Sequence, residues 1–189
     1  MKKYAYCLFE KTRDIGSDLK NHVEFDACYD ISPKKTRVRM TVLFVCTANI
    51  NRSFMAERIL RGELKKHQKQ NVDASSAALI DMKGEPADPV AAKLLQASGY
   101  DGDGHQSRLL TEEMVLQADL ILVMGGNQRK LILDQYPQAD EKVRLLKSYA
   151  RDYTEADGDI RDPHRMSIYH YRLCFSEIYL SIQGLVKCI

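Results

Sequence analysis

The sequence predicts an α/β fold, a single domain in which a four-stranded parallel sheet is flanked by helices. Short apolar runs of strand length alternate along the chain with segments of helical periodicity. One run, 120–124 (LILVM), is wholly apolar, as expected of a parallel strand covered on both faces. A length of 189 residues is sufficient for one sizeable core. Alternating strands and helices also imply right-handed crossover connections.

The first predicted strand and helix enclose a short polar turn. Residues 42–45 (VLFV) are apolar and β-prone, and we expect a helix over 53–66. The apolar residues at helical spacing in that segment are Met55, Ala56, Ile59, Leu60 and Leu64. A strand that runs directly into a helix leaves backbone N–H groups pointing into the turn, which favours anion binding there.

The remaining elements continue the alternation. A strand is expected at 72–79, followed by a helix with Asp88 as its N-cap, Pro89 as its first residue and Gly99 at its end. Thr111 is expected to cap a short helix. Further strands are predicted at 120–124 and 143–146, with a helix around 131–133 between them and a long amphipathic helix over 168–185.

Cys46 and Arg52 lie on either side of the first turn. The helix dipole and a nearby guanidinium favour a thiolate at Cys46, and the planar fork of Arg52 suits two phosphate oxygens. Ligands of parallel sheets bind beyond the carboxyl ends of strands, where Cys46 is expected. Together the two residues predict a nucleophilic thiolate beneath a bound oxyanion.

The spacing alone is not specific, because Cys7 and Arg13 are equally far apart. The segment between them contains Glu10, which would repel a phosphate, and no evident amphipathic helix follows it. We therefore interpret Cys7 as structural.

The stretch VLFVCTANINRSFMAE resembles the phosphate loop of the low-molecular-weight protein tyrosine phosphatases. The residues that match the family pattern are Cys46, Asn49, Arg52 and Ser53. Ala48 stands where the family usually has Gly, which would strain the loop if that position needs positive φ; Asn51 replaces a common Cys, and Phe54 a common Pro. The resemblance implies phosphate binding or loop support by Thr47, Ala48, Asn49, Ile50, Asn51 and Ser53.

The resemblance extends in order from about residue 41 to the C-terminus. It implies a flavodoxin-like, three-layer α/β/α catalytic domain over 41–189, preceded by an N-terminal extension, 1–40, that we expect to pack on the domain or a partner. Since Met40 directly precedes the first strand, it is an alternative start.

The implied activity is hydrolysis of protein phosphotyrosine through a phosphocysteine at Cys46, with Arg52 binding the phosphate. The family has an Asp-Pro before its last helix, and Asp162 with Pro163 matches it. That Asp protonates the leaving group and later activates water. From the residues alone, the nearby acids Asp152, Asp157 and Asp159 remain alternatives.

The resemblance also implies a hydrogen-bond network around Asn49, which tolerates left-handed φ. In the family this Asn pairs with a Ser on the second strand and a His in the following loop. The residues in those places along this chain are Ser76 and His105. His164 and Arg165 stand at the cleft wall, where an aromatic residue often follows the Asp-Pro, and they favour acidic phosphopeptides or a non-aryl phosphate. Gly125 and Gly126 replace an acidic residue common after the third strand.

The composition of the chain limits the kinds of partner and cofactor that we expect. A net charge of +2 is too small to argue for nucleic acid, and no apolar run reaches the length of a membrane span. Five cysteines without CxxC spacing argue against zinc and suit a reducing cytoplasm. No metal or other cofactor is implied, because loop amides and Arg52 can carry the transition-state charge.

The expected partners are a phosphotyrosine protein, with a tyrosine kinase as one candidate, and inorganic phosphate as product. Two alternatives remain. An arsenate reductase needs two further redox cysteines, and the chain has none between Cys46 and Cys174. A non-catalytic phosphotyrosine- or oxyanion-binding module fits Ala48 and His164, but binding alone needs neither a nucleophile nor an acid.

Overall fold

The computed structural model describes residues 39–151, 153–154 and 158–189. The expectations for Cys7 and for the extension up to residue 38 lie outside the described residues. The strands are β1 (Met40–Cys46), β2 (Val72–Ala78), β3 (Leu120–Val123) and β4 (Val143–Leu145). The helices are α1 (Arg52–Lys66), α2 (Pro89–Ala97), α3 (Glu112–Gln117), α4 (Gly126–Gln135) and α5 (Ile168–Cys188), with two 3-10 helices, η1 (Pro137–Lys142) and η2 (Leu146–Tyr149).

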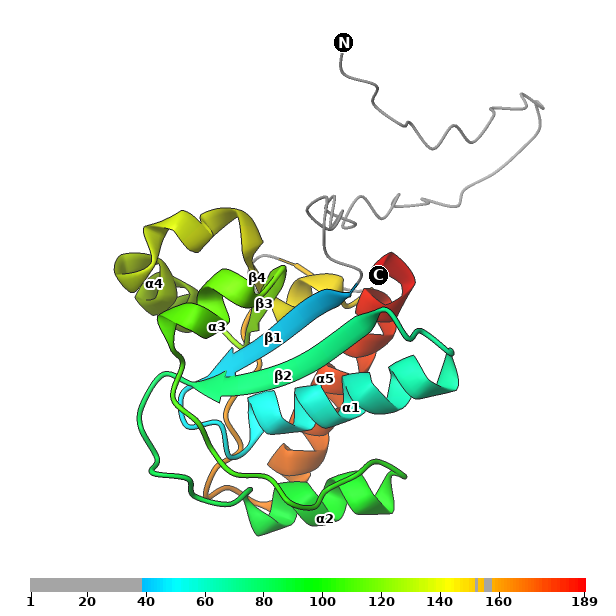
Figure 1. Cartoon of the computed structure of the whole chain (residues 1–189). Coiled ribbons are helices and arrows are strands. Elements are labelled where there is room, and N and C mark those ends of the chain that lie inside the picture. The colour runs from blue at the N-terminus through cyan, green and yellow to red at the C-terminus, as the bar shows by residue number, and fades with distance from the viewer. Residues whose placement is uncertain (1–38, 152, 155–157) are drawn as a thin grey trace, which may run out of the picture.

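The sheet has four parallel strands in the order β2-β1-β3-β4. The chain leaves β1 toward β2 on one side and returns to place β3 on the other side (Figure 1). The order therefore reverses at β1, and the carboxyl end of β1 is the switch point at which such sheets bind ligands. Cys46 is the last residue of β1.

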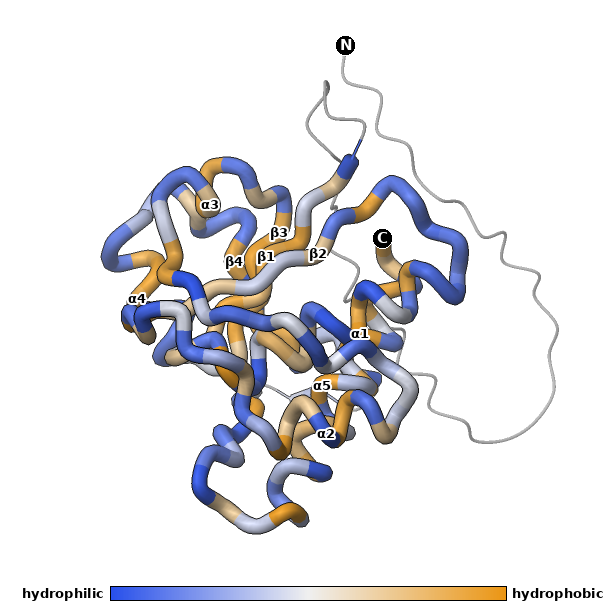
Figure 2. The backbone as a smooth tube through the Cα atoms, turned by 60° about the horizontal axis from the view of Figure 1, so that its bottom comes forward, coloured by the Kyte–Doolittle hydropathy of each residue, from blue (hydrophilic) through white to orange (hydrophobic). Residues whose placement is uncertain are grey.

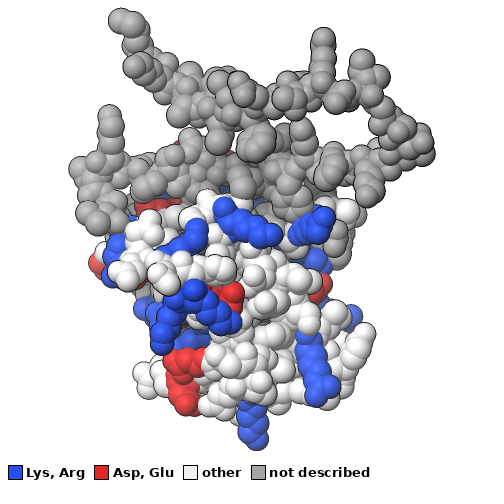
Figure 3. Space-filling view, turned by 90° about the vertical axis from the view of Figure 1, so that its right-hand side faces the viewer, with Lys and Arg blue, Asp and Glu red and all other residues white. Residues whose placement is uncertain are grey.

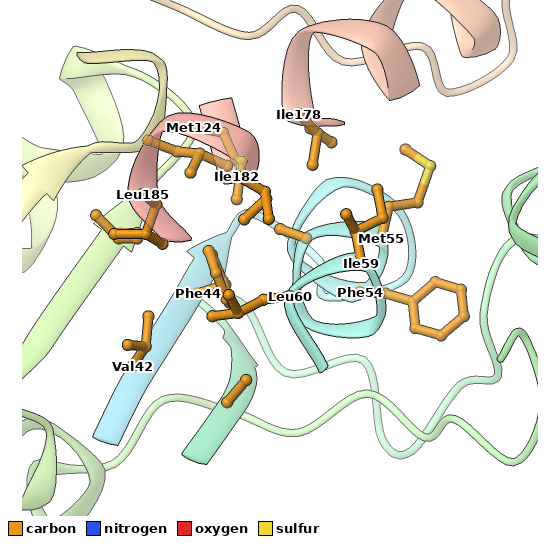
Figure 4. Close-up of a cluster of buried hydrophobic side chains, with 14 of the residues drawn as sticks. Val42, Phe44, Phe54, Met55, Ile59, Leu60, Met124, Ile178, Ile182 and Leu185 are labelled. Carbon is orange, nitrogen blue, oxygen red and sulfur yellow. The ribbon is translucent and has the colours of Figure 1, made fainter. Parts of the chain in front are cut away.

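Two apolar cores lie on opposite faces of the sheet. Val42 and Phe44 of β1 face one core, which includes residues of α1, α2 and α5. Leu43 and Val45 face the other, with α3 and α4. Figure 4 shows the first core, where Phe44 lies among side chains of α1 and α5. This alternation follows from the two-residue period of a strand and gives the three layers expected.

The hydropathy of the chain follows this arrangement. In Figure 2 the central strands are largely apolar, whereas most of the loops around them are polar. Figure 3 shows Lys and Arg side chains scattered over one face of the described part, with fewer Asp and Glu side chains among them. No helix in the described part of the chain combines the length and apolarity needed to cross a membrane.

The predicted element order and the fold class are confirmed, with small differences at element ends. The Asp88 side chain caps α2 by accepting a hydrogen bond from Val90 N (2.8 Å), and Gly99 has φ 81° beyond the end of α2. The strand expected at 72–79 ends one residue earlier, at Ala78, and the amide of Leu79 donates to both Cys46 O and Thr47 O (3.0 Å each). The two 3-10 helices were not predicted.

Candidate active site

The turn from β1 to α1 surrounds the sulfur of Cys46. The Cys46 side chain is buried, with 3% of the residue exposed. Its Sγ lies 3.0 Å from Ser53 Oγ and accepts a hydrogen bond from the amide of Asn49 (3.3 Å). The amides of Arg52 and Ser53 open α1, where no preceding turn supplies carbonyl acceptors. The sulfur therefore lies at the polar start of α1, in contact with Asn49 and Ser53.

Asn49 holds the turn in shape. Its φ of 54° is left-handed, as expected for an Asn at this place. Its Nδ2 donates to Ser53 Oγ (2.9 Å) and Ser76 Oγ (2.8 Å), and its Oδ1 accepts from the amide of Arg108 (3.2 Å). The structure thus brings Ser76, which lies 27 residues after Asn49, to the turn that contains Asn49 and Ser53.

The segment after α2 closes over the same turn. His105 Nε2 lies 2.5 Å from Asn49 O, and Ser107 Oγ donates to Ala48 O (2.8 Å). Burial lowers the pKa of His105 below its usual value, although the hydrogen bond to Asn49 opposes this shift. A neutral imidazole with its proton on Nε2 is the donor that this carbonyl requires.

The replacement of Gly by Ala48 does not strain the loop. The described non-glycine residues with positive φ are Asn49, Gln68, Lys83 and Arg165, so Ala48 is outside the left-handed region. The condition under which we expected strain is absent.

The other turn residues tie the loop to its surroundings. Thr47 O accepts from the amides of Leu79 and Ile80, both at 3.0 Å, and Thr47 Oγ1 accepts from Gln128 Nε2 (3.3 Å). Ile50 O accepts from the amide of Asp88 (2.8 Å). The turn is therefore fixed to the end of β2, to α4 and to the N-terminus of α2.

A buried carboxylate that sequence reasoning missed extends this network. Ser76 Oγ donates to Glu57, which is 5% exposed and pairs with Arg61 at 2.9 Å. Glu57 lies four residues after Ser53, so both side chains lie on one face of α1. This four-residue spacing is the sequence pattern from which a position of Glu57 near the site could have been predicted.

Arg52 connects the turn to the loop before α5, residues 158–167, which we call the acid loop. Arg52 Nη1 donates to Ile160 O (3.2 Å), and Nη2 lies 2.5 Å from Asp162 Oδ2. Arg52 Nε is buried without a hydrogen-bond partner in the described part of the chain. Asp162 Oδ1 accepts from the amide of His164 (3.1 Å). Of the alternative acids, Asp159 bonds elsewhere, and Asp152 and Asp157 lie outside the described residues.

The predicted wall residues, His164 and Arg165, come directly after Pro163. His164 Nδ1 lies 3.6 Å from Asp88 Oδ2, which also accepts from Tyr171 OH (2.7 Å). Burial, together with the bond to Asp88, raises the pKa of Tyr171 to about 12, so Tyr171 remains a donor. Asn51 is buried next to Tyr171, and Arg165 is exposed in a left-handed conformation.

The geometry supplies three chemical groups at one place: a sulfur, a guanidinium and a partly exposed carboxylate. They can bind an oxyanion, attack it and move a proton. Among the described residues, no group of three or more His, Cys, Asp or Glu side chains is arranged to hold a metal ion.

Comparison with known proteins identifies the family. The family model described as "Low molecular weight phosphotyrosine protein phosphatase" matches residues 41–189. The chain belongs to this family. The resemblance inferred from the sequence is thereby confirmed, and with it the assignment to phosphatases, hydrolases of phosphoric monoesters.

Several phosphatases of the family are similar along almost their whole length. A "Probable low molecular weight protein-tyrosine-phosphatase EpsP" of Ralstonia solanacearum is 34% identical over 149 residues, which cover 79% of this chain and 95% of the relative. The solved low molecular weight protein tyrosine phosphatase of T. tengcongensis superposes with a TM-score of 0.73 at 32% identity, covering 79% of this chain and 99% of that one.

One solved phosphatase of the family has a different named specificity. It is described as the YwlE arginine phosphatase, in a mutant with a phosphorylated active-site serine. It superposes with a TM-score of 0.72 at 31% identity, covering 78% of this chain and 94% of that one. Similarity to this chain therefore extends to both tyrosine and arginine phosphatases.

Proposed function

We propose that this chain is a cytoplasmic protein tyrosine phosphatase that works through a phosphocysteine at Cys46. The observation that carries the proposal is the position of Arg52, which begins the helix behind the Cys46 turn and pairs with Asp162 at 2.5 Å. A nucleophile, a phosphate-binding group and an acid thus converge from two distant segments. Neither binding alone nor a structural role requires all three.

In the first step, the Cys46 thiolate attacks the phosphorus of phosphotyrosine. The phosphate oxygens bind the amides of the 46–53 turn and the guanidinium of Arg52. Asp162, in its protonated form, gives its proton to the tyrosine oxygen as the P–O bond breaks. The products of this step are a phosphocysteine and a neutral tyrosine side chain.

In the second step, the Asp162 carboxylate takes a proton from water as that water attacks the phosphocysteine. The S–P bond breaks, inorganic phosphate leaves, and the electron pair returns to sulfur. Ser53 Oγ, 3.0 Å from Cys46 Sγ, donates a hydrogen bond that stabilises the departing thiolate. Asn49, Ser76 and His105 keep the turn in the required shape.

The pair of Arg52 and Asp162 has a consequence for binding. Phosphate is also an anion and competes with the Asp162 carboxylate for Arg52 Nη2. We therefore expect Asp162 to leave Arg52 when substrate binds and to turn toward the leaving oxygen. With 42% of its side chain exposed, Asp162 has room to move.

The proposed substrate is phosphotyrosine in a protein, with a tyrosine kinase as the candidate partner. The names of the family model and of the Ralstonia solanacearum relative support this choice. The arginine phosphatase among the similar structures makes phosphoarginine the second candidate. Rates on one peptide carrying either phosphotyrosine or phosphoarginine separate the two.

The direct test is release of p-nitrophenol from p-nitrophenyl phosphate in metal-free buffer. We expect activity in the wild type and none in Cys46→Ser. Cys174→Ala, which changes another buried cysteine of the described part, is the matched control and should remain active. An inactive wild type that still binds phosphotyrosine peptide would instead favour the non-catalytic binding module.

A further inference from the structure

The turn after β3 lies against the acid loop. The amide of Ile160 donates to Met124 O (2.7 Å), and the amide of Gly126 donates to Asp159 Oδ1 (2.8 Å). Two hydrogen bonds in opposite directions thus join the residues that follow β3 to those that precede Asp162. The loop that carries the acid is fixed to the sheet on this side.

Gly125 allows this close approach. A Cβ at this position would lie 2.9 Å from the carboxyl carbon and from both carboxylate oxygens of Asp159, nearer than real contacts allow. The φ of Gly125 is −173°, an extended conformation that any residue can adopt. Space for the Asp159 carboxylate, and not backbone freedom, is therefore what requires glycine here.

The Asp159 carboxylate also supplies what the N-terminus of α4 lacks. Gly125 is the N-cap of α4 and has no side chain that could accept from the first amides of the helix. Asp159 provides the acceptor from outside the helix, and its negative charge lies at the positive end of the helix dipole. Asp159 is itself exposed, so this contact, and not burial, determines its position.

Ile160, the residue after Asp159, links the turn after β3 to the candidate site. Ile160 is 1% exposed, its amide is bound to Met124, and its carbonyl accepts from Arg52 Nη1 (3.2 Å). Two residues further along, Asp162 lies at Arg52 Nη2. A shift of Asp159 would therefore move Asp162 relative to the phosphate-binding guanidinium.

We propose that Asp159 is a positioning residue for the reaction: its contact with the Gly125–Gly126 turn fixes the acid loop so that Asp162 can reach the leaving oxygen. The proposal rests on the proposed phosphatase function and on the role of Asp162 within it. Asp159 does not touch the substrate; its carboxylate supplies, from the acid loop, the capping side chain that Gly125 lacks.

The test compares two leaving groups. The p-nitrophenolate ion departs with little help from an acid, whereas phenolate needs a proton, so phenyl phosphate depends more on Asp162. We measure kcat/KM on both substrates, because it includes departure of the leaving group. Asp159→Ala should lose about 10-fold or more on phenyl phosphate and less than about 3-fold on p-nitrophenyl phosphate, a fraction of the 100-fold or larger effect that a general acid can have.

Three further variants make the result specific. Asp159→Asn keeps an oxygen acceptor for Gly126 N and should recover most of the loss. Gly125→Ala should reproduce the leaving-group pattern of Asp159→Ala, because its Cβ displaces the carboxylate. Asp140→Ala removes another exposed carboxylate, which binds Arg129 of α4 at 2.6 Å, and should leave both substrates unchanged.

The double variant Asp159→Ala/Asp162→Ala decides between positioning and general destabilisation. If Asp159 acts through Asp162, adding Asp159→Ala to Asp162→Ala causes no further loss on phenyl phosphate. Equal losses on both substrates, or a full additional loss in the double variant, would overturn the proposal. An unchanged rate in Cys46→Ser would instead contradict the proposed function, so the two failures are distinguishable.

Discussion

At the residue scale, Asn49 combines a strained backbone with several hydrogen bonds. A left-handed φ costs an ordinary residue about 1–2 kcal/mol, and Asn is among the few that adopt it readily. In return, its side chain joins Ser53, Ser76 and the amide of Arg108. Conformation and bonding at one position together determine the shape of the turn around the sulfur.

Substitution of Asn49 separates these two contributions. Asn49→Gly keeps the left-handed φ and loses the side-chain bonds, whereas Asn49→Ala loses both. We expect kcat with p-nitrophenyl phosphate to fall in both variants and to fall further in Asn49→Ala, by about 10-fold if the strain of about 1–2 kcal/mol is expressed in the turn. Equal rates in the two variants would contradict a role for the backbone conformation.

Arg165 is the residue whose charge we expect to affect substrate choice. It is exposed, lies three residues after Asp162 and has φ 59°. Arg165→Ala should raise KM about two- to fivefold for a phosphotyrosine peptide with acidic flanks, because an exposed ion pair contributes about 0–1 kcal/mol. KM for p-nitrophenyl phosphate should stay unchanged.

Arg165→Lys is the matched control for this experiment. It keeps the charge and should keep the low KM for the acidic peptide. If KM for the acidic peptide does not change in Arg165→Ala, Arg165 does not bind the acidic residues that flank the phosphotyrosine.

At the element scale, a single carboxylate joins α1 to α5 and to the segment after α2. Glu63 of α1 accepts from Lys66 Nζ, Tyr100 OH and Gln183 Nε2, each at 2.7 Å. Burial works to raise the pKa of Glu63, but the hydrogen bonds from Lys66, Gln183 and Tyr100 outweigh it and hold the pKa below its usual value. The charged form of Glu63 therefore stabilises the packing of these elements.

The sign of this shift predicts a pH dependence of stability. Because the folded-state pKa of Glu63 lies below its usual value of 4.5, its contribution is complete above pH 4.5 and is lost as the pH falls through the folded-state pKa. Glu63→Gln should lower the free energy of unfolding by about 1–3 kcal/mol at pH 7, and by less at low pH. Urea unfolding at pH 7 and below pH 4.5 measures both.

Glu113→Gln provides the control for Glu63→Gln. Glu113 is exposed in the first turn of α3, where it accepts a hydrogen bond from the side chain of Gln117 (2.7 Å). Its substitution should change stability little at either pH. A similar loss in both variants would contradict the network around Glu63.

Elements with a strong local pattern were predictable, and elements made by tertiary contacts were not. The apolar run of β3 and the cap at Asp88 were both present in the sequence and were found where expected. By contrast, η1 and η2 are short 3-10 segments without a periodic apolar pattern. The end of β2 also differs by one residue from the prediction, since the strand ends at Ala78.

At the scale of the whole molecule, the topology brings three distant segments to one edge of the sheet. The Cys46 turn, the loop with His105 and the acid loop all lie beyond the carboxyl end of β1 or its neighbours. A sequence motif predicted Cys46 and Arg52. The partners of Asn49 and the choice of Asp162 needed the order of a known family, because their proximity arises only in the fold.

The contacts that no sequence pattern predicted are those between unrelated loops. Gly125 and Gly126 were noted only as departures from the family, yet the reason for Gly125 is the Asp159 carboxylate against it. Glu57 could be placed on the face of Ser53 by spacing, but its bond to Ser76 crosses from α1 to β2. Such pairs become visible when the sheet order is known.

A chain that starts at Met40 tests the domain boundary. Met40 is the first residue of β1, pairs with Val72 and is 5% exposed, while every contact of the candidate site comes from residue 46 onward. We expect kcat/KM for p-nitrophenyl phosphate to be the same in this shorter chain and in the full chain. A large loss would assign residues 1–39 a part in catalysis.

The phosphocysteine is the central claim, and the most direct measurement is the mass of the peptide that contains Cys46. The protein is quenched in acid during turnover of a phosphotyrosine peptide, digested, and compared with Cys46→Ala treated in the same way. We predict one added phosphoryl group on the Cys46 peptide of the wild type and none in Cys46→Ala. An active wild type without phosphate on Cys46, or with phosphate on another residue, would contradict the account.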